Sequence, residues 1–353
     1  MNDRVIHRLE ALGVSLFRLN LSHIKLDDLP GTIEFVRSRT SVPICLDTEG
    51  AQIRTGDLPA SAMMVEDNSV IQISRKPVPG NVEGLAFYPG SIMDQLRVGD
   101  LISIDFHTVL AQVINCDTSC VVLRVLNGGN FGANKAVSVD RPIHLPPLTE
   151  KDCAALEIGI QYGITHVALS FANQGSDVDK IRSLAGSEAT VIAKIECRNG
   201  LANLDAIAEK ADAPLIDRGD LSREIPIEQI PPTQKIIMKR AKEHERKVYV
   251  ATNLLESMVT EPMPTRAEVN DVYNTLLDGA DGLVLAAETA IGAHPIGCAN
   301  MIVKLVQEYE RRNAGPFQFS AKPENSATSL LVEPHGGTLI NCQQRTPDTS
   351  ELN

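Results

Sequence analysis

Two opposite charges lie inside one apolar stretch of the sequence, TVIAKIECRNG (190–200). The side chains of a strand alternate between its two faces, so Lys194 and Glu196 are expected to project in the same direction. Asp220 ends the next apolar segment, APLIDRGD (213–220). A buried ion pair alone is a poor stabiliser, and here a third charge accompanies it. The pattern therefore indicates a functional cluster.

Two carboxylates with few other protein ligands suit a divalent metal ion. Mg²⁺ and Mn²⁺ prefer oxygen ligands, keep several waters and take further oxygens from a substrate. The ammonium of Lys194 cannot bind the same ion, so it is available for negative charge on that substrate. The sequence thus predicts a Mg²⁺ (or Mn²⁺) site at Glu196 and Asp220. The alternative is a structural ion pair between Lys194 and Glu196.

Further polar residues follow the first two apolar segments of the chain. Arg18 lies within LFRLNLSH, and Arg54 in QIRTG follows the segment that ends at Asp47. Two guanidinium groups near a metal indicate a phosphate or carboxylate to be bound. Side chains with oxygen atoms could also hold a monovalent cation, although such residues equally well cap helices. The candidate residues for such a cation site are Asn20, Ser22, Asp47 and Thr48.

The elements that position these residues form a regular alternation. Strand-like segments alternate with amphipathic helical patterns, which predicts a parallel sheet. Polar residues such as Ser170 gather at the carboxyl ends of the strands, as in a (β/α)8 barrel, whereas an open sheet binds ligands at one switch point. A TIM-type α/β barrel is therefore expected. Its recognisable strands are segments 15–20, 42–47, 165–171, 190–196, 213–220, 247–252 and 281–289.

This barrel is one strand short. The sequence opens on a helical pattern over 4–12, so the missing first strand is expected before residue 1, and segment 328–334 (TSLLVEP) is one candidate replacement. Residues 57–140 break the alternation with β-rich segments and Gly, Asn and Asp turns, which predicts an inserted all-β lid domain. The barrel is expected to comprise residues 1–56 and 141–315, on either side of the lid at 57–140, with a linker and a disordered tail at 316–353.

Composition excludes several classes of function. A net charge of -12 argues against nucleic acid or an anionic membrane surface as the main partner. There is no signal-peptide pattern and no run of about 18 apolar residues, so a cytoplasmic location is expected. The seven cysteines are odd in number and scattered, which indicates free thiols in a reducing compartment.

Several motifs occur in the order found in one enzyme family. The chain resembles the pyruvate kinases over about residues 4–312. The resemblance implies a (β/α)8 barrel with an inserted β lid, and transfer of the phosphoryl group of phosphoenolpyruvate to ADP with Mg²⁺ and usually K⁺, giving pyruvate and ATP in glycolysis. The motifs are RLNLSH, LDTEGAQIRTG, NGGNFGANKAV, LPPLTEKD, SFANQ, AKIECRNG, DRGDLSREIP, ATNLLESM and PTRAEVNDVYNTLLDGAD.

The resemblance also implies roles for individual residues. Glu196 and Asp220 would hold the divalent metal, Lys194 would neutralise charge on the phosphoryl group and the enolate, and Arg18 would bind the phosphate. Thr252 would lie near the carbon that takes a proton, through water. Substrate would contact Arg18, Ser170, Lys194, Gly219, Asp220 and Thr252; K⁺ would contact Asn20, Ser22, Asp47 and Thr48; nucleotide phosphates would face His23, Arg54 and Lys135.

The chain departs from the family pattern on the nucleotide side. The paired aspartates of the lid read Asp105-Phe106, and Asn173 and Gln174 stand where the family has a basic pair. Glu49 and Gln52 are further departures, and the family's first strand and C-terminal domain are absent. Segment 330–341 (LLVEPHGGTLIN) is similar to the opening of ATP sulfurylases, which makes His335 an inert residue of a stub.

Three hypotheses follow. The first is a pyruvate kinase that acts without a C-terminal domain and can form homo-oligomers through its barrel helices. The second is a divergent homologue that uses another phosphoryl acceptor, or performs metal-assisted enolate chemistry on a keto acid such as oxaloacetate. The third is a non-catalytic homologue that binds only a metabolite or a partner.

Overall fold

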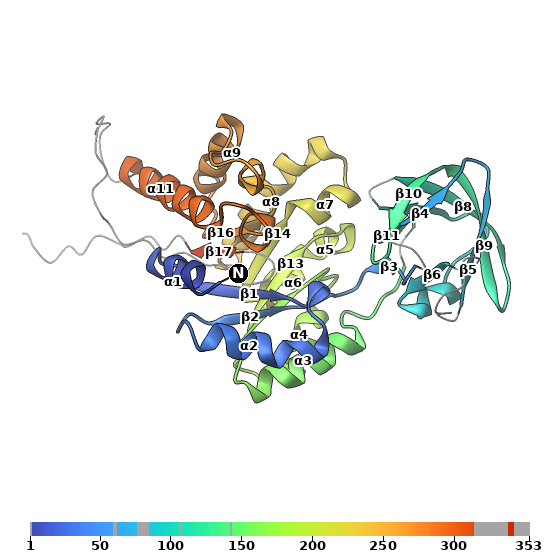
Figure 1. The fold of residues 1–353 in the computed structure, drawn as a ribbon, viewed down its shortest axis with the longest axis horizontal. Helices are drawn as coiled ribbons and strands as arrows, with labels where there is room; N and C mark the ends of the chain where they lie inside the picture. Colours follow the sequence, from blue (N-terminus) through green and yellow to red (C-terminus); the bar gives the residue numbers. More distant parts are fainter. Residues whose placement is uncertain are drawn as a thin grey trace, which may run out of the picture. The chain divides into compact units, whose positions relative to one another are not determined.

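The computed structural model describes residues 2–58, 62–75, 85–105, 108–141, 143–313 and 338–341. The chain divides into two compact units (Figure 1). Unit 1 comprises Met1–Gly50 and Glu150–Asn353, and unit 2 comprises Ala51–Thr149. The insertion predicted at 57–140 lies within unit 2, whose bounds extend further on both sides.

Unit 1 contains a closed barrel, as the sequence predicted. The strand order around the barrel is β1-β17-β16-β15-β14-β13-β12-β2. Every strand expected from the sequence belongs to it, which confirms the TIM-type α/β fold. The strands are β1 (Leu16–Asn20), β2 (Ile44–Asp47), β12 (His166–Leu169), β13 (Thr190–Ile195), β14 (Ala213–Asp217), β15 (Tyr249–Ala251), β16 (Gly282–Leu285) and β17 (Thr338–Asn341).

Helices surround this barrel (Figure 1). Because they cover the outside while side chains fill the inside, strands such as β2 and β14 are buried along their whole length. The helices are α1 (Asp3–Ala11), α2 (Leu29–Arg37), α3 (Glu150–Gln161), α4 (Gly175–Ala185), α5 (Arg198–Ala202), α6 (Leu204–Lys210), α7 (Arg218–Glu224), α8 (Ile230–Glu243), α9 (Arg266–Leu277), α10 (Ala287–Ala290) and α11 (Pro295–Asn313), with short 3₁₀ helices at Leu21–His23, Leu26–Asp28, Ile227–Gln229 and Glu256–Val259.

The eighth strand of the barrel is not one that the sequence predicted. β17 pairs antiparallel with β1 and with β16, whereas the other neighbouring strands of the barrel pair in parallel. Its residues belong to the segment 316–353 that was expected to be a linker and a disordered tail. The pairing satisfies backbone groups of β1 and β16 that would otherwise form open edges. The candidate segment 328–334 and His335 lie outside the described residues.

Strands β14 and β16 end three or more residues earlier than the sequence suggested. β14 stops at Asp217, and α7 begins at the next residue, because the side chain of Asp217 accepts a hydrogen bond from the backbone N–H of Asp220 and caps the helix. Asp220 is therefore a helical residue and not the last residue of a strand. β16 also stops early, at Leu285, and Glu288 lies in α10.

Helix α9 begins with a capping box. Thr265 Oγ1 accepts a hydrogen bond from the backbone N–H of Glu268 at 3.2 Å, and a carboxylate oxygen of Glu268 accepts one from the N–H of Thr265 at 2.7 Å. Glu268 also accepts a hydrogen bond from the N–H of Ser257 at 2.7 Å. One carboxylate thus fixes both the start of α9 and the loop before it.

We expect Glu268→Gln to lower the free energy of unfolding by about 1 kcal/mol at pH 7. Burial raises the pKa of Glu268, but hydrogen bonds from Ser257 and Thr265 outweigh it and hold the pKa below its usual value. The contribution of the carboxylate is therefore present above its unfolded pKa of about 4.3 and is lost as the pH falls through its folded pKa. Urea unfolding at several pH values measures the effect. The exposed Glu261→Gln is the control, and an equal loss at pH 3 and pH 7 would contradict the explanation.

Unit 2 is all-β apart from a short 3₁₀ helix at Gly90–Asp94 in the described residues. It contains a closed barrel with the order β11-β3-β6-β5-β9-β8-β7 and a two-stranded sheet of β10 and β4. Alternate residues of its strands fill the core, among them Val109, Ala111 and Val113. The strands are β3 (Ile53–Thr55), β4 (Ala62–Val65), β5 (Val70–Ser74), β6 (Leu85–Tyr88), β7 (Leu101–Ile104), β8 (Val109–Cys116), β9 (Cys120–Asn127), β10 (Gly129–Gly132) and β11 (Ala136–Val139).

Candidate active site

The carboxyl ends of the strands in unit 1 bring the predicted charged residues together. Lys194 lies near the end of β13, and Glu196 follows that strand directly. Asp47 ends β2, Asp217 ends β14, and Thr252 follows β15. Parallel pairing places all of these strand ends at the same rim of the barrel, which is where barrels of this type carry their functional groups.

The ammonium of Lys194 is the centre of this group. Its Nζ lies 2.7 Å from Oε1 of Glu196, 3.5 Å from Oδ1 of Asp47 and 3.7 Å from Oδ2 of Asp217, and it donates a hydrogen bond to Ser170 Oγ at 3.1 Å. Lys194 is only 5% exposed. Burial lowers the pKa of Lys194, but the charges of Asp47, Glu196 and Asp217 outweigh this and hold it above its usual value. The side chain is therefore a buried cation.

Arg18 joins the same network through Asp47. The guanidinium of Arg18, on β1, forms an ion pair with Oδ2 of Asp47, and Ser170 Oγ donates a hydrogen bond to Oδ1 of Asp47 at 3.1 Å. Asp47 is 1% exposed, so these contacts are shielded from water. One carboxylate thus positions two cations, Arg18 and Lys194, at the rim of the barrel.

Three carboxylates form what we call the acidic cluster: Glu196, Asp217 and Asp220. One oxygen of each lies within 4.8 Å of an oxygen of the others. Glu196 is 0% exposed; its Oε2 accepts a hydrogen bond from the N–H of Phe171 at 2.6 Å. Among the described residues, its Oε1 faces the Lys194 ammonium without the alignment of a hydrogen bond.

The electrostatics of the acidic cluster favour a cation. Burial is the main cause that raises the pKa of Glu196 to about 8; the negative charges of Asp220 and Asp217 add to it, and Lys194 opposes it. The cluster holds three carboxylates beside the Lys194 ammonium, and Asp220 also pairs with Arg223 at 2.8 Å. Carboxylate oxygens at this spacing, from two buried residues and the partly exposed Asp220, are the donor set that Mg²⁺ or Mn²⁺ takes. The residues therefore fit a divalent metal ion.

Asp217 was missed in the sequence. It is 8% exposed, and its Oδ1 accepts hydrogen bonds from Thr252 Oγ1 at 2.7 Å and from the N–H of Asp220 at 3.4 Å. Burial raises the pKa of Asp217, but Lys194 and the Thr252 hydrogen bond outweigh it and lower the pKa overall. The available signal was the motif DRGD, because Asp217 stands at a strand end just as Asp47 does.

The backbone around Thr252 is held in an unusual conformation. Thr252 has φ of 74°, a left-handed value that is strained for a β-branched residue. Arg218 holds this turn by donating two hydrogen bonds to the Thr252 carbonyl, at 3.1 and 2.8 Å. A Cβ atom added to Gly219 would lie 2.7 Å from Thr252 Cγ2, so only glycine fits there. The Thr252 hydroxyl is thus fixed beside the first turn of α7.

The predicted monovalent-cation residues lie on neighbouring strand ends. Asn20 pairs with Asp47 in the register of β1 and β2. The side chain of Asn20 accepts a hydrogen bond from the N–H of Ser22 at 2.9 Å, and Thr48 Oγ1 accepts one from the N–H of Ser170 at 3.0 Å. Asn20 therefore caps the 3₁₀ helix Leu21–His23, which is the alternative role that its residue type allows, and Thr48 binds the backbone just after β12.

The predicted nucleotide-binding residues belong to different units. His23 lies in a 3₁₀ helix of unit 1. Arg54 and Lys135 lie in unit 2, where Arg54 donates a hydrogen bond to the carbonyl of Asn134 at 2.8 Å and Lys135 pairs with Asp105 at 3.2 Å. The two are adjacent because β3 and β11 pair at Arg54 and Ala136.

Three of the departures from the family pattern have structural roles. Gln174 caps α4 in a capping box with Asp177, and Asn173 donates a hydrogen bond to the carbonyl of Phe171 at 3.0 Å. Glu49 pairs with Lys151 at 2.9 Å. Phe106 lies outside the described residues.

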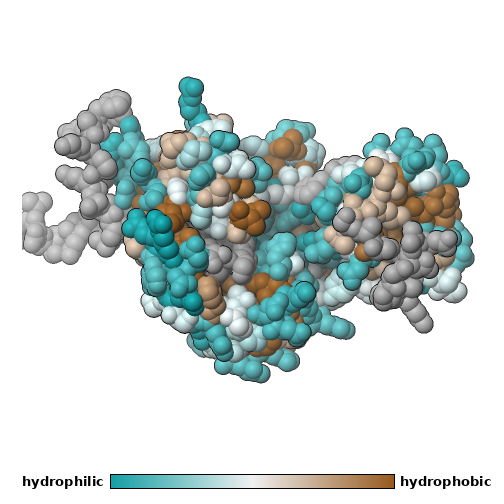
Figure 2. All heavy atoms as spheres, viewed as in Figure 1, coloured by the Kyte–Doolittle hydropathy of each residue, from teal (hydrophilic) through white to brown (hydrophobic). Residues whose placement is uncertain are grey.

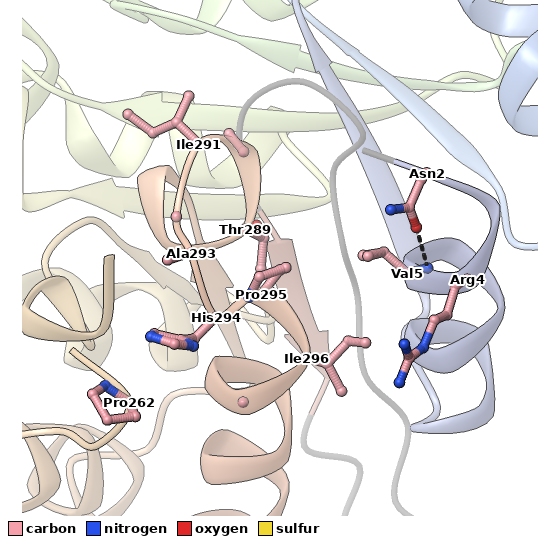
Figure 3. A pocket seen from close by; sticks show the side chains of 13 residues that line it. Asn2, Arg4, Val5, Pro262, Thr289, Ile291, Ala293, His294, Pro295 and Ile296 are labelled. Atoms are coloured by element: carbon pink, nitrogen blue, oxygen red, sulfur yellow. Dashed lines mark hydrogen bonds between the residues drawn. The ribbon is translucent and has the colours of Figure 1, made fainter. Parts of the chain in front are cut away.

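A pocket elsewhere in unit 1 contains none of the acidic cluster. Figure 3 shows its lining, which comes from the start of α1, from residues 289–297 and from Pro262. Asn2 Oδ1 there accepts a hydrogen bond from the N–H of Val5 at 3.1 Å, which caps α1. Elsewhere on the surface, polar and apolar residues are interspersed on the face shown in Figure 2. Among the described helices, none is long and apolar enough to cross a membrane.

The fold and the site together define a (β/α)8 barrel protein with a buried lysine and an acidic cluster at the carboxyl ends of its strands. The family model for the barrel domain of pyruvate kinase matches residues 1–299. The chain belongs to the pyruvate kinase family. This confirms the resemblance that the motifs indicated.

Curated relatives with the name pyruvate kinase match most of the chain. That of Methylorubrum extorquens is 34% identical over 313 residues, which cover 87% of this chain and 66% of the relative. That of Geobacillus stearothermophilus is 35% identical over 340 residues, 93% of this chain and 58% of the relative. That of Chlamydia trachomatis serovar D is 33% identical over 341 residues, 94% of this chain and 70% of the relative. The chain thus spans less than two thirds of the first two relatives.

Proposed function

We propose that the protein is a pyruvate kinase-like phosphotransferase, which moves the phosphoryl group of phosphoenolpyruvate to ADP and yields pyruvate and ATP, the glycolytic reaction. The observation that carries this proposal is the position of the Lys194 ammonium, 2.7 Å from a carboxylate of the acidic cluster. Phosphoryl transfer requires mainly positioning and cationic stabilisation of developing charge, and the buried Lys194 ammonium beside the acidic cluster supports this role.

In the proposed reaction, Glu196 and Asp220 hold the divalent metal ion. When bound, Mg²⁺ or Mn²⁺ supplies positive charge that neutralises the oxygens of the phosphoryl group and the enolate. Lys194 adds a fixed positive charge on the same side, and its pKa keeps it protonated. Arg18 binds the phosphate, and its pairing with Asp47 fixes its orientation. Ser170, which contacts both Lys194 and Asp47, belongs to the substrate site.

The remaining assignments extend the proposal. Gly219, Asp220 and Thr252 receive the substrate carboxylate, and Thr252 lies near the enolate carbon that takes a proton through water. Asn20, Ser22, Asp47 and Thr48 hold K⁺, although their present hydrogen bonds must then rearrange. The nucleotide phosphates face His23, Arg54 and Lys135. Homo-oligomers form through the barrel helices.

The test is formation of pyruvate by the purified protein. With saturating phosphoenolpyruvate, ADP, Mg²⁺ and K⁺, we expect pyruvate to appear in an assay coupled to lactate dehydrogenase and NADH. Omission of ADP and addition of EDTA should each stop it. A folded protein that forms no pyruvate would overturn the proposal. Exchange of the methyl protons of pyruvate with D₂O, without transfer to ADP, would instead support the divergent enolate chemistry.

A further inference from the structure

The donors beside the acidic cluster are already used by a carboxylate of the chain itself. Asp217 Oδ1 accepts hydrogen bonds from the Thr252 hydroxyl at 2.7 Å and from the Asp220 amide at 3.4 Å. Its Oδ2 lies 3.7 Å from Lys194 Nζ. We call the hydroxyl and the amide the Thr252–Asp220 donor pair.

A carboxylate-bearing substrate needs donors of this kind. If such a substrate binds a metal ion held by Glu196 and Asp220, its own carboxylate needs hydrogen-bond donors nearby because its negative charge is taken out of water. The Thr252–Asp220 donor pair is fixed at that place by the strained turn at Thr252 and by the hydrogen bonds from Arg218. Two carboxylates cannot share one donor pair, because like charges at that distance repel.

We infer that Asp217 is a specificity-determining residue whose carboxylate occupies the position for the substrate carboxylate, and so competes with phosphoenolpyruvate. This inference depends on the proposed function, because it takes the substrate from it. Phosphoenolpyruvate displaces the Asp217 side chain when it binds, and this displacement lowers its affinity. A ligand that carries phosphate but no carboxylate is not affected by the competition.

A purely structural role for Asp217 explains less of its surroundings. Asn caps a helix as well as Asp does, and an uncharged cap would avoid repulsion from Glu196 and Asp220, although it would lose the pairing of Asp217 with Lys194 at 3.7 Å. The Asp217 carboxylate is instead buried within a cluster that holds two other carboxylates within 4.8 Å. A negative charge at this position therefore raises the affinity of the site for a metal ion and lowers its affinity for a substrate anion.

The experiment compares wild type with Asp217→Ala and Asp217→Asn. Calorimetry measures the Kd of Mn²⁺ alone, then the Kd values of phosphoenolpyruvate, oxalate and inorganic phosphate in the presence of saturating Mn²⁺. We expect Asp217→Ala to tighten phosphoenolpyruvate and oxalate by about tenfold or more and to leave phosphate within about twofold. Asp217→Asn, which keeps the helix cap, should tighten them by a smaller factor. Where turnover is measurable, KM for phosphoenolpyruvate should fall more than kcat changes.

Several results would overturn the inference. Unchanged or weaker binding of phosphoenolpyruvate in both variants would do so, and so would a loss of Mn²⁺ affinity of about 100-fold, which would make Asp217 a metal ligand. If the alanine variant does not fold, the Kd values of Asp217→Asn alone test the inference. The proposed function is tested separately from this inference. Absence of pyruvate formation in wild type and variants contradicts the proposed function, whereas tighter oxalate binding in the variants still supports the role of Asp217.

Discussion

Replacing Lys194 by methionine abolishes phosphoryl transfer: we expect kcat for pyruvate formation to fall by about 10³-fold or more. Methionine is similar in length but has no charge, so the developing enolate loses its fixed cation. The same change leaves the carboxylates of Asp47, Glu196 and Asp217 without the ammonium that lies within 3.7 Å of each. Removal of one partner from a buried ion pair costs about 3–5 kcal/mol, so the melting temperature should fall as well.

Loss of folding must be separated from loss of catalysis in this variant. Activity is therefore measured below the melting transition, which circular dichroism locates for each protein. Lys242→Met is the matched control, because Lys242 pairs with Asp281 at 2.6 Å while 48% of its side chain is exposed. That surface pair contributes about 0–1 kcal/mol, and the control should keep wild-type kcat. A folded Lys194→Met protein with a tenth of wild-type activity would contradict the assignment.

Glu196→Gln is expected to weaken Mn²⁺ binding by about 100-fold or more, because even the outer-shell partners of a metal ligand contribute about 10–100-fold to metal affinity. Glutamine has the shape of glutamate, and its carbonyl oxygen can still accept the hydrogen bond from the N–H of Phe171. What it loses is the negative charge of a fully buried ligand in the acidic cluster. The stability of the fold should change little, because Lys194 loses the charge of Glu196 but keeps the carboxylates of Asp47 and Asp217 within 3.7 Å.

Titration with Mn²⁺, followed by calorimetry or by the electron paramagnetic resonance of the free ion, measures the affinity without any turnover. Glu209→Gln is the control, since Glu209 is an exposed residue of α6. Equal Mn²⁺ affinity in wild type and Glu196→Gln would show that the ion binds elsewhere, and the proposed metal site would then be wrong.

The features of this site that depend on strand periodicity could be predicted from the sequence. Lys194 and Glu196 lie two residues apart at the end of one strand, so alternation alone places them on one face, and the 2.7 Å distance between Nζ and Oε1 agrees with that. The apolar segments of the barrel strands were equally recognisable, because strands covered by helices outside and by side chains inside are apolar throughout.

The features that depend on tertiary contacts could not be predicted. The segment 213–220 looked like one strand, whereas the side chain of Asp217 caps α7, so that the chain is already helical from Arg218 onward. That capping cannot be distinguished from an extended strand by periodicity. The position of β17 could not be predicted either. It is determined by pairing with the free edges of β1 and β16, and not by a local pattern in residues 338–341.

The bridging position of Asp47 has an evolutionary consequence. One carboxylate contacts the guanidinium of Arg18 and lies 3.5 Å from the ammonium of Lys194. A substitution at any of these three positions changes the surroundings of the other two, so their effects should be strongly non-additive. Because of this epistasis, a single substitution at Arg18, Asp47 or Lys194 is strongly unfavourable. Once one of the three residues has been replaced, selection to retain the other two is weaker.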